Sequence, residues 1–350
     1  MDLYIMCRDR IGAEWKDNKF KIIDKSICPL YLLNTGNVWH WLEMRAIDYH
    51  RANSRLLKKA LRLLERDDIS CVISVNAVTI TDSYWVKPVG SDLKYADVRF
   101  GDDFFSDLAL RGNYDSFNKA LASQKTRTPE LTNIGSFEKC WKLIDGEWWM
   151  YKAADIKQQF SEIFISELGK KLGFNMALYI KGSKCVKTKD FTNSGQVNFE
   201  PAYSFMGEDE DYIETVKRLK ILAPHTIGDY VRIIFMDTVT ANPDRHTFNF
   251  GLLRNAEDGS IISLAPNFDN NMALISRGYP GNTERKKDVF IDLFTELMEY
   301  DRELIKYIPE IREETVREII ENINMRVRRE TVLRFVMNGY RRIAERIKGI

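Results

Sequence analysis

The stretch Asn242-Pro-Asp-Arg-His-Thr-Phe-Asn249 brings acidic, amide and imidazole side chains together in one short segment. It follows a run rich in apolar residues, which predicts a helix over 226–240 that ends just before it. Asp244 and Asn249 lie five positions apart, and a further acid, Asp269, follows after a predicted hairpin. Phosphoryl transfer needs a carboxylate near the acceptor hydroxyl and oxygen ligands for Mg²⁺ on the phosphates. These three side chains supply that set.

Composition restricts the remaining classes of function. With 350 residues, 44% hydrophobic and 29% charged, the chain can bury a sizeable core and form two or three folding units. Its 52 basic and 51 acidic side chains give a formal charge of +1, so no global field predicts direct nucleic-acid or membrane binding. Five scattered cysteines argue against a disulfide framework or a thiolate zinc site. No apolar leader or long apolar stretch is present, and we expect a cytoplasmic protein.

The first third of the chain predicts a mixture of helix and strand. Apolar residues recur on one stripe of Ser54–Glu65, which indicates an amphipathic helix. The run Ile69–Ile80 is dense in β-branched residues and predicts a strand, and Asp82–Pro88 predicts another. Glycine, proline and many polar residues with little periodicity over 89–130 predict an irregular linker. We place a domain boundary near 125.

The segment Asn133–Glu200 predicts a small mixed sheet with one helix. Phe137–Ile144 and Glu147–Ala153 predict a hairpin joined by an Asp-Gly turn. A helix is expected over Gln158–Leu172, followed by a second pair of short strands. Beyond about 208 the pattern is mainly helical.

Over about 130–350 the sequence resembles the HipA-like kinases, distant relatives of protein kinases and phosphatidylinositol kinases. The opening stretch is similar to the family's D-R/G-H-x-x-N loop. Ile134-Gly-Ser-Phe-Glu-Lys139 looks like the family's phosphate-covering G-x-Q-E-K loop, and Trp149-Met-Tyr-Lys152 looks like the strand that bears the ATP lysine. Ser161–Gly173 resembles the N-E-x-x-x-x-x-L-A-x-x-L-G helix that follows. Val186–Phe191 sits where the family's adenine-contacting hinge ends.

The resemblance implies a role for each matching residue. Asp244 matches the catalytic acid, and Asn249 and Asp269 match the metal ligands. The implied ATP-binding residues come from the loop, the strand, the helix, the hinge and the catalytic loop: Gly135, Ser136, Lys152, Glu162, Lys189, Phe191 and His246. Ser136 and Thr132 are the implied candidates for autophosphorylation. The implied cofactors are ATP and Mg²⁺.

The fold implied by the resemblance is α+β and bilobal, like a protein kinase, with a small β-rich N-lobe and a mainly helical C-lobe. An additional α/β N-terminal domain precedes it. The expected domains are an accessory N-terminal domain over 1–125, the kinase N-lobe over 126–205 and the helical C-lobe over 206–350.

The expected function is transfer of the ATP γ-phosphate to a Ser or Thr hydroxyl of a protein substrate. Two alternatives stand beside it. One is a lipid or small-molecule kinase, because phosphatidylinositol kinases share the order of the catalytic loop. The other is a nucleotide-binding regulator or toxin–antitoxin component that acts by association, with an antitoxin-like partner.

Three features each allow two interpretations. His246 is a metal ligand or a brace for its loop, and the scarcity of histidine, with no second ligand four residues on, favours the brace. Arg245 contacts a phosphorylated group or nucleotide, or it shapes the local charge. The last 26 residues, Met325–Ile350, carry eight Arg or Lys against two Glu. They form a solvated basic helix face, the favoured interpretation, or bind a partner.

Overall fold

The computed structural model describes residues 1–350 and divides into two compact units. Unit 1 comprises Met1–Ala153, Lys187–Glu200 and Leu253–Ile262, and unit 2 comprises Ala154–Val186, Pro201–Leu252 and Ser263–Ile350. The boundaries between the units fall within four strands: β8 (Cys185–Lys189), β9 (Val197–Pro201), β10 (Gly251–Asn255) and β11 (Ile261–Leu264). Two sheets include these strands, in the orders β5-β6-β8-β7 and β11-β10-β9. Each unit is described below by itself.

Unit 1 begins with a four-stranded antiparallel sheet in the order β3-β2-β1-β4. Its strands are β1 (Leu3–Cys7), β2 (Arg10–Lys16), β3 (Lys19–Ile22) and β4 (Tyr84–Pro88). The helices of this unit are short: α1 (Leu30–Thr35), α2 (Val38–Glu43), α3 (Ala52–Ala60), α4 (Asp68–Ser74), α5 (Tyr95–Val98), α6 (Ser106–Arg111), α7 (Tyr114–Leu121) and the 3-10 helix η1 (Pro129–Thr132). Buried Leu57, Cys71 and Phe105 share one hydrophobic cluster, which packs α3, α4, α6, α7 and η1 together.

The hairpin predicted around Asp145-Gly146 is confirmed. Strands β5 (Lys139–Ile144) and β6 (Glu147–Ala153) pair antiparallel, with Lys139 opposite Lys152. Asp145 and Gly146 both have positive φ, 51° and 82°, as a two-residue turn between right-twisted strands requires. This turn sets the register that places Lys152 next to the last residue of β6.

Two predictions for the first third are wrong. The run Ile69–Ile80 is not a strand, because the Asp67 side chain accepts a hydrogen bond from the Ser70 N–H and starts helix α4. Most of its β-branched residues are buried in the core rather than paired in a sheet: Val72, Val75, Val78, Thr79 and Ile80. The supposed linker 89–130 contains α5, α6, α7 and η1. These helices have four to eight residues, which is too short for hydrophobic periodicity to reveal.

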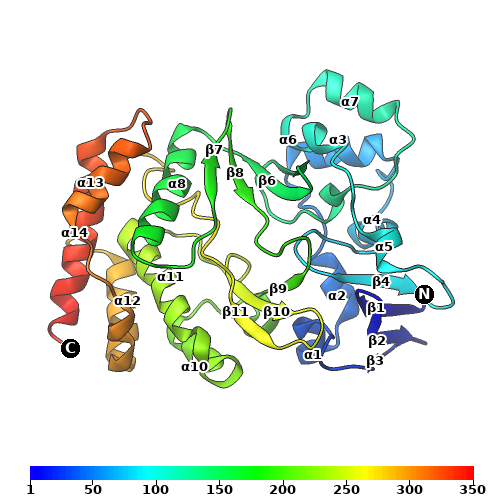
Figure 1. Ribbon diagram of the computed structural model, residues 1–350, viewed down its shortest axis with the longest axis horizontal. Coiled ribbons are helices and arrows are strands. Elements are labelled where there is room, and N and C mark those ends of the chain that lie inside the picture. Colours follow the sequence, from blue (N-terminus) through cyan, green and yellow to red (C-terminus); the bar gives the residue numbers. More distant parts are fainter. The chain divides into compact units, whose positions relative to one another are not determined.

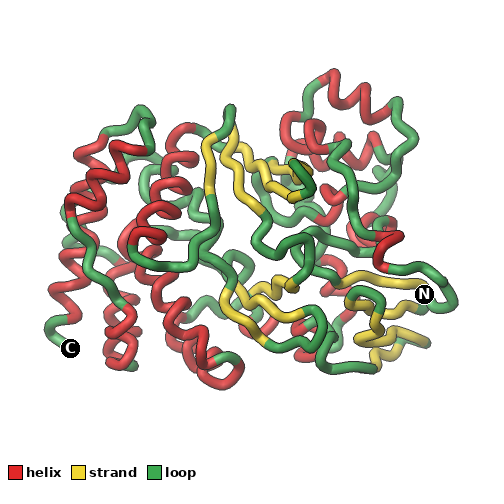
Figure 2. Tube along the Cα trace, viewed as in Figure 1, coloured by secondary structure: helices red, strands yellow, loops and turns green.

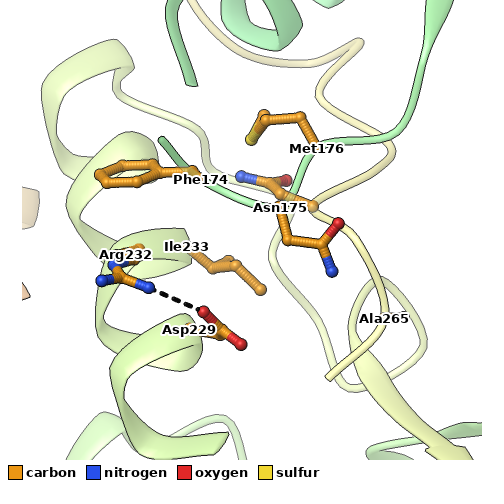
Figure 3. A pocket seen from close by; sticks show the side chains of 8 residues that line it. Phe174, Asn175, Met176, Asp229, Arg232, Ile233 and Ala265 are labelled. Atoms are coloured by element: carbon orange, nitrogen blue, oxygen red, sulfur yellow. Dashed lines mark hydrogen bonds and ion pairs between the residues drawn. The ribbon is translucent and has the colours of Figure 1, made fainter. Parts of the chain in front are cut away.

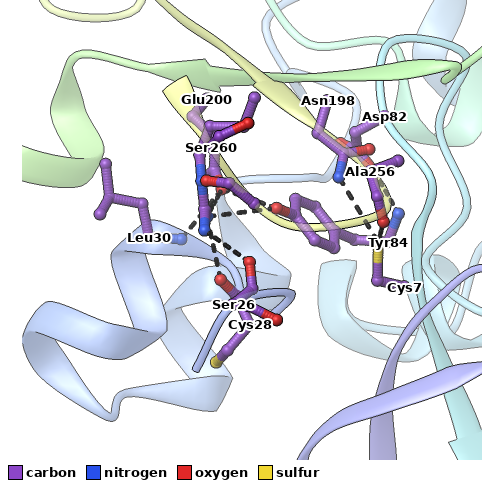
Figure 4. A network of polar contacts seen from close by, with 12 residues as sticks. Cys7, Ser26, Cys28, Leu30, Asp82, Tyr84, Asn198, Glu200, Ala256 and Ser260 are labelled. Carbon is purple, nitrogen blue, oxygen red and sulfur yellow. Dashed lines mark hydrogen bonds and ion pairs between the residues drawn. The ribbon is translucent and has the colours of Figure 1, made fainter. Parts of the chain in front are cut away.

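A buried polar network fastens strand β10 within unit 1 (Figure 4). Arg254 Nη1 donates to Glu200 Oε1 at 2.7 Å and to the Cys28 carbonyl at 3.0 Å, and the Tyr84 hydroxyl donates to the same Glu200 oxygen at 2.8 Å. Burial raises the pKa of the Cys28 thiol to about 12 and also raises the pKa of Cys7. All five cysteines are buried. Cys7 and Cys28 are therefore protonated packing residues rather than reactive thiolates.

Unit 2 is mainly helical, as Figures 1 and 2 show. Its elements are α8 (Ile156–Lys171), β7 (Tyr179–Lys181), α9 (Tyr203–Met206), α10 (Tyr212–Leu222), η2 (Pro224–Thr226), α11 (Ile227–Thr240), α12 (Val289–Tyr300), η3 (Arg302–Tyr307), α13 (Glu313–Asn322) and α14 (Arg329–Ile347). Asp155 and Gln158 form a capping box that starts α8, close to the predicted beginning of this helix. Helix α11 is almost completely buried and packs against α8, α10, α12 and α14. None of the helices has the length and apolarity needed to span a bilayer.

Candidate functional site

Arg245 lies at the centre of the stretch 242–249 and organises unit 2 around it. Its Nε and Nη2 donate to the two carboxylate oxygens of Asp237 on α11, at 2.8 and 3.0 Å. Nη1 donates to the carbonyls of Asn249 and Phe268, at 2.5 and 2.8 Å. Nη2 also donates to the amide oxygens of Asn267 and Asn270, at 3.0 and 2.7 Å. One guanidinium thus joins the end of α11, the loop 242–249 and the segment 267–270.

The charge of Arg245 is buried with its partner. The side chains of Arg245 and Asp237 are 3% and 1% exposed. Burial alone lowers the pKa of Arg245, but the charge and hydrogen bonds of Asp237, with the charges of Asp269 and Glu162, raise it above its ordinary value. Because every N–H group of the guanidinium already has an acceptor inside unit 2, the structure favours the interpretation of Arg245 as an organiser of local charge.

The loop between Asn242 and Asn249 is held by its own polar groups. The Asp244 N–H donates to Asn242 Oδ1 at 3.2 Å, and Asn249 Nδ2 donates to the Asp244 carbonyl at 2.8 Å. Since Nδ2 of Asn249 is engaged there, Oδ1 is the atom that this amide can offer to a cation. His246 Nδ1 accepts from the Phe248 N–H at 3.2 Å, so the imidazole braces the loop, as its sequence context favours. Asp244 itself is partly exposed.

The segment around Asp269 is fixed from α8 and β7. The Asn270 N–H donates to Glu162 Oε2 at 2.9 Å, and the Asp269 N–H donates to the Tyr179 hydroxyl oxygen at 2.9 Å. Burial, together with the charges of Glu162 and Asp269, raises the pKa of Tyr179 well above its ordinary value, so the phenol stays neutral. Asp269 has a φ of 57°, in the left-handed region, and these two contacts hold it there. Its side chain is partly exposed.

Every carbonyl in the last turn of α11 has a donor, although the helix ends directly at the loop. Arg285 is the main cap: it is 2% exposed and its guanidinium binds two of the four carbonyls. The pairs are Asp237 with the Asn242 N–H (2.9 Å), Thr238 with Arg285 Nη2 (2.8 Å), Val239 with Arg285 Nη1 (3.0 Å) and Thr240 with the Leu274 N–H (2.8 Å). A cation at a helix C-terminus also complements the helix dipole. The loop therefore starts from a fully satisfied helix end.

A hollow of about 240 Å³, which includes space open to solvent, lies beside α11 (Figure 3). Its lining residues are Phe174, Asn175, Met176, Asp229, Arg232, Ile233, Ala265 and Asn267. Arg232 Nη1 donates to Asp229 Oδ1 at 3.0 Å within it. None of the residues expected from the sequence to act in catalysis or binding lines this hollow, which touches the Arg245 frame through Asn267 alone.

The expected phosphate-covering loop and the lysine lie in unit 1. Lys152 is 7% exposed, and its Nζ lies 4.9 Å from the centre of the Phe137 ring. Gly135 has a φ of 107°, which only glycine adopts readily, and a Cβ there would come 2.5 Å from Lys139 Nζ. Ser136 is exposed, whereas Thr132 is 4% exposed and donates its hydroxyl to the Val78 carbonyl at 2.6 Å. Of the two candidate acceptors, Ser136 is the accessible one.

Buried groups that the sequence did not indicate brace both ends of this loop. Glu130 is fully buried and accepts from the Trp141 N–H at 2.8 Å and from Asn133 Nδ2 at 3.0 Å. Burial raises the pKa of Glu130 to about 7. Arg51 donates to the Asn133 carbonyl at 2.8 Å and to the Lys139 carbonyl at 2.6 Å. Arg51 therefore binds both ends of the loop between Asn133 and Lys139.

The two residues expected at the hinge have different surroundings. Lys189 forms an exposed ion pair with Glu147 at 2.6 Å. Phe191 packs edge-on against Phe199, with ring centres 5.7 Å apart. Neither contact indicates adenine binding, and their role stays a prediction.

In unit 2, Arg245 connects the loop 242–249, which carries Asp244, His246 and Asn249, with the segment 267–270, which carries Asp269. Glu162 on α8 is joined to the same segment through the Asn270 N–H. The remaining expected residues belong to unit 1: Thr132, Gly135, Ser136, Lys152, Lys189 and Phe191. The oxygen atoms of Asn249 and Asp269 are of the hard type that Mg²⁺ prefers. No group of three His, Cys, Asp or Glu side chains gathers into a protein-only metal cage. This donor set suits a Mg²⁺ ion that is also held by phosphates and water.

Comparison with known proteins gives the fold. No protein-family profile matches the sequence, and no curated protein matches it. HipA from Shewanella oneidensis MR-1, solved with HipB and operator DNA, resembles the chain with a TM-score of 0.53 and 12% identity, over 98% of this chain and 97% of that one. A proinflammatory kinase of Helicobacter pylori, CtkA, matches with a TM-score of 0.43 and 18% identity, over 61% and 90%. The likeness to HipA confirms the fold expected from the sequence and extends it into the N-terminal third.

Proposed function

We propose that this chain, which has the fold of HipA, is an ATP- and Mg²⁺-dependent kinase that phosphorylates a Ser or Thr hydroxyl of a protein. The observation that carries the proposal is the frame around Arg245. Arg245 Nη1 donates to the backbone carbonyl of Asn249 and to that of Phe268, the residue before Asp269. The amide and the carboxylate proposed to bind Mg²⁺ therefore lie on two backbones that share one buried anchor.

Each residue has a distinct proposed task. Asp244 orients the acceptor hydroxyl and accepts its proton late in the transfer, because a carboxylate of ordinary basicity is a weak base for an alcohol. Asn249 and Asp269 offer oxygen ligands, and bound Mg²⁺ would neutralise charge on the phosphates. Lys152 provides a positive charge for the phosphates of ATP. Glu162 supports the site by holding the backbone that follows Asp269.

The test is the variant Asp244→Asn, which keeps the size of the side chain and removes its charge. We expect retained folding and ATP binding, with transfer from labelled ATP reduced at least about a thousandfold. Asp209→Asn, an exposed acid in the same unit, is the matched control and should keep full activity. Phosphoprotein formation by Asp244→Asn at the wild-type rate would refute the assignment.

The class of acceptor needs its own experiment. Labelled ATP is offered with a protein extract, phosphoinositide vesicles and a set of small alcohols in parallel. We expect label in protein on Ser or Thr. Label in lipid or in a small molecule alone would replace the proposal with the corresponding kinase class.

Autophosphorylation is proposed at Ser136, because it is exposed on the expected phosphate-covering loop while the Thr132 hydroxyl is buried and engaged. Incubation with Mg-ATP should raise the intact mass by one phosphate, and Ser136→Ala should abolish the increase. An increase that persists in Ser136→Ala would assign the phosphate elsewhere.

A toxin–antitoxin role is the second candidate, favoured by one observation. The HipA structure that resembles this chain over nearly its whole length contains HipB and operator DNA. If the role applies here, the chain purified from its native cells should carry a stoichiometric protein partner that lowers its kinase activity. A chain that elutes alone, with unchanged activity, would contradict this role.

A further inference from the structure

The segment that follows Asp269 runs along the beginning of α14. The Tyr279 hydroxyl oxygen accepts from the Arg328 N–H at 2.8 Å, and Asn338 Nδ2 donates to the Thr283 carbonyl at 2.9 Å. The guanidinium of Arg285 lies 4.4 Å from the centre of the Phe335 ring. These three contacts attach the segment 277–287 to the N-terminal half of the helix.

Exposed cations gather where the two elements meet. Arg277, Lys286 and Lys287 lie on the segment, and Arg326, Arg328 and Arg329 lie at the start of the helix. We name these six residues the basic surface. None of the six forms an ion pair with an acidic side chain. Of the neighbouring acids, Glu330 pairs with Arg317 and Asp288 pairs with Arg285, which leaves Glu284 as the exposed acid on the segment.

The other half of α14 is different. Arg341 pairs with Glu313 at 2.9 Å, Arg342 pairs with Glu345 at 2.9 Å, and Arg346 pairs with Asp292 at 3.2 Å. There, acids of α12, α13 and α14 neutralise these three arginines, and the sequence-based interpretation as a solvated face is sufficient. The basic surface lacks this compensation, so its like charges repel one another until an anionic partner arrives.

We propose that the basic surface binds a segment rich in Asp and Glu on the protein substrate. The proposal rests on the proposed kinase function. The segment 277–287 begins eight residues after Asp269, and its Arg285 caps the end of α11 that leads into the loop 242–249. Acidic residues beside the phosphorylated hydroxyl would make several exposed ion pairs, each weak and sensitive to salt. The surface then selects the substrate by charge and adds nothing to the chemical step.

A protein partner fits this surface better than a nucleic acid does. Single-stranded nucleic acids are usually held by aromatic rings on which bases stack. Tyr279 is the aromatic residue at this surface, and its ring is already contacted by Lys157 Nζ at 5.5 Å and by Arg328 Cζ at 4.7 Å. Because two cations already contact the Tyr279 ring, the basic surface attracts a partner mainly through its positive charge.

Binding is tested without ATP, with a fluorescein-labelled peptide that has one Ser followed by a block of Glu. The double variant Lys286→Gln/Lys287→Gln should bind this peptide about fivefold more weakly than the wild type, since each exposed ion pair contributes about 0.5 kcal/mol. The matched control is Arg341→Gln/Arg342→Gln, which removes two cations from the paired half of α14 and should bind as the wild type does. The difference should vanish at about 0.5 M salt. Equal weakening in both double variants, or in neither, would overturn the proposal.

Turnover separates this proposal from the kinase function itself. With the Glu peptide as substrate, the Lys286→Gln/Lys287→Gln variant should show a higher KM for peptide with unchanged kcat and unchanged KM for ATP. If the peptide binds with the expected variant pattern to wild type and Asp244→Asn but is never phosphorylated, the surface stands and the proposed kinase function fails. If phosphorylation occurs with no preference for the Glu peptide over a Gln-substituted peptide, the surface proposal fails and the kinase function stands. Tighter binding of a labelled oligonucleotide, lost in the same variant, would reassign the surface to nucleic acid.

Discussion

Replacement of Arg245 by methionine tests the frame on which the site depends. Methionine fills part of the same volume but leaves Asp237 as a buried carboxylate without its cation, at 1% side-chain exposure. Breaking a buried ion pair from one side typically costs about 3–5 kcal/mol, and the oxygen atoms that lose a donor here lie on three separate segments. We therefore expect Arg245→Met to lower the free energy of unfolding of unit 2 by about 4 kcal/mol.

Two further variants distinguish the contribution of the charge of Arg245 to stability from the contribution of its geometry. Arg245→Lys keeps the charge but loses the planar fork, so it cannot reach Asp237, Asn249 and Phe268 together. An intermediate loss of about 2 kcal/mol is expected. The double variant Asp237→Leu/Arg245→Met removes both charges and should be more stable than Arg245→Met alone, because no uncompensated carboxylate remains in the core.

Urea unfolding followed by far-UV circular dichroism measures these differences. Arg232→Met is the matched control, since Arg232 lies on α11 and pairs with Asp229 at a half-exposed position. Its loss should stay below about 1 kcal/mol. The reasoning is refuted if Arg245→Met unfolds like the wild type while its affinity for ATP falls, because Arg245 would then be a ligand of the nucleotide rather than the anchor of the frame.

Three further outcomes follow from the structure. Gly135→Ala and Gly278→Ala each place a side chain at a positive φ, 107° and 120°, and each should lower the free energy of unfolding by about 1 kcal/mol or more. Only the alanine at 135 crowds its loop, so only Gly135→Ala should weaken ATP binding, which calorimetry measures. Burial raises the pKa of Glu130 in the folded state to about 7, above its unfolded value, so its contribution to stability is complete below about pH 4.5 and is lost as the pH rises through 7. Between pH 5 and pH 8 the free energy of unfolding of the wild type should fall by about 2 kcal/mol relative to that of Glu130→Gln. Parallel pH profiles of the two proteins would contradict this. Arg285→Gly relieves the φ of 52° but uncaps α11, so activity should fall and recover with added methylguanidinium. Arg62→Gly relieves a similar φ of 59° at an exposed position and should behave as the wild type. A fall that methylguanidinium cannot reverse would count against capping.

The sequence was most informative where chemistry and local geometry coincide. Asp145-Gly146 predicted its turn because few residue pairs adopt two positive φ angles, and the structure has that turn. The stretch 242–249 indicated its chemistry because acidic, amide and imidazole side chains are unusual at that density, and the fold agrees with the family that the stretch resembles. In both cases the signal lies within a few consecutive residues.

The first third was predicted less well for a physical reason. Short helices such as α4 and α6 give at most two turns of periodicity, and their starts depend on single caps such as Asp67. Their burial comes from packing against distant segments, so β-branched residues in Ile69–Ile80 served a core and not a sheet. Tertiary context overrode the local preference there.

The frame of the site was beyond the reach of the sequence because its contacts join distant positions. Arg245 meets Asn270 25 residues later, and Glu162 meets the Asn270 backbone 108 residues earlier. Arg285 showed no motif and caps a helix that ended 45 residues before it. A buried charge and a helix end each require a hydrogen-bond partner, and this requirement can be predicted from the sequence. Which residue supplies the partner cannot be predicted in this way.

The C-terminal basic run shows the same limit for charge. In sequence, Arg328 and Arg341 are equivalent members of one run of cations with a helix-like pattern. In the structure, Arg341 is neutralised by Glu313 on α13, whereas Arg328 lies over Tyr279 with no carboxylate partner. A count of charges therefore describes the helix, but only the tertiary arrangement of the acids divides it into a half that is already satisfied and a half that attracts a partner. Substrate choice by charge would then be encoded in the missing acids as much as in the arginines.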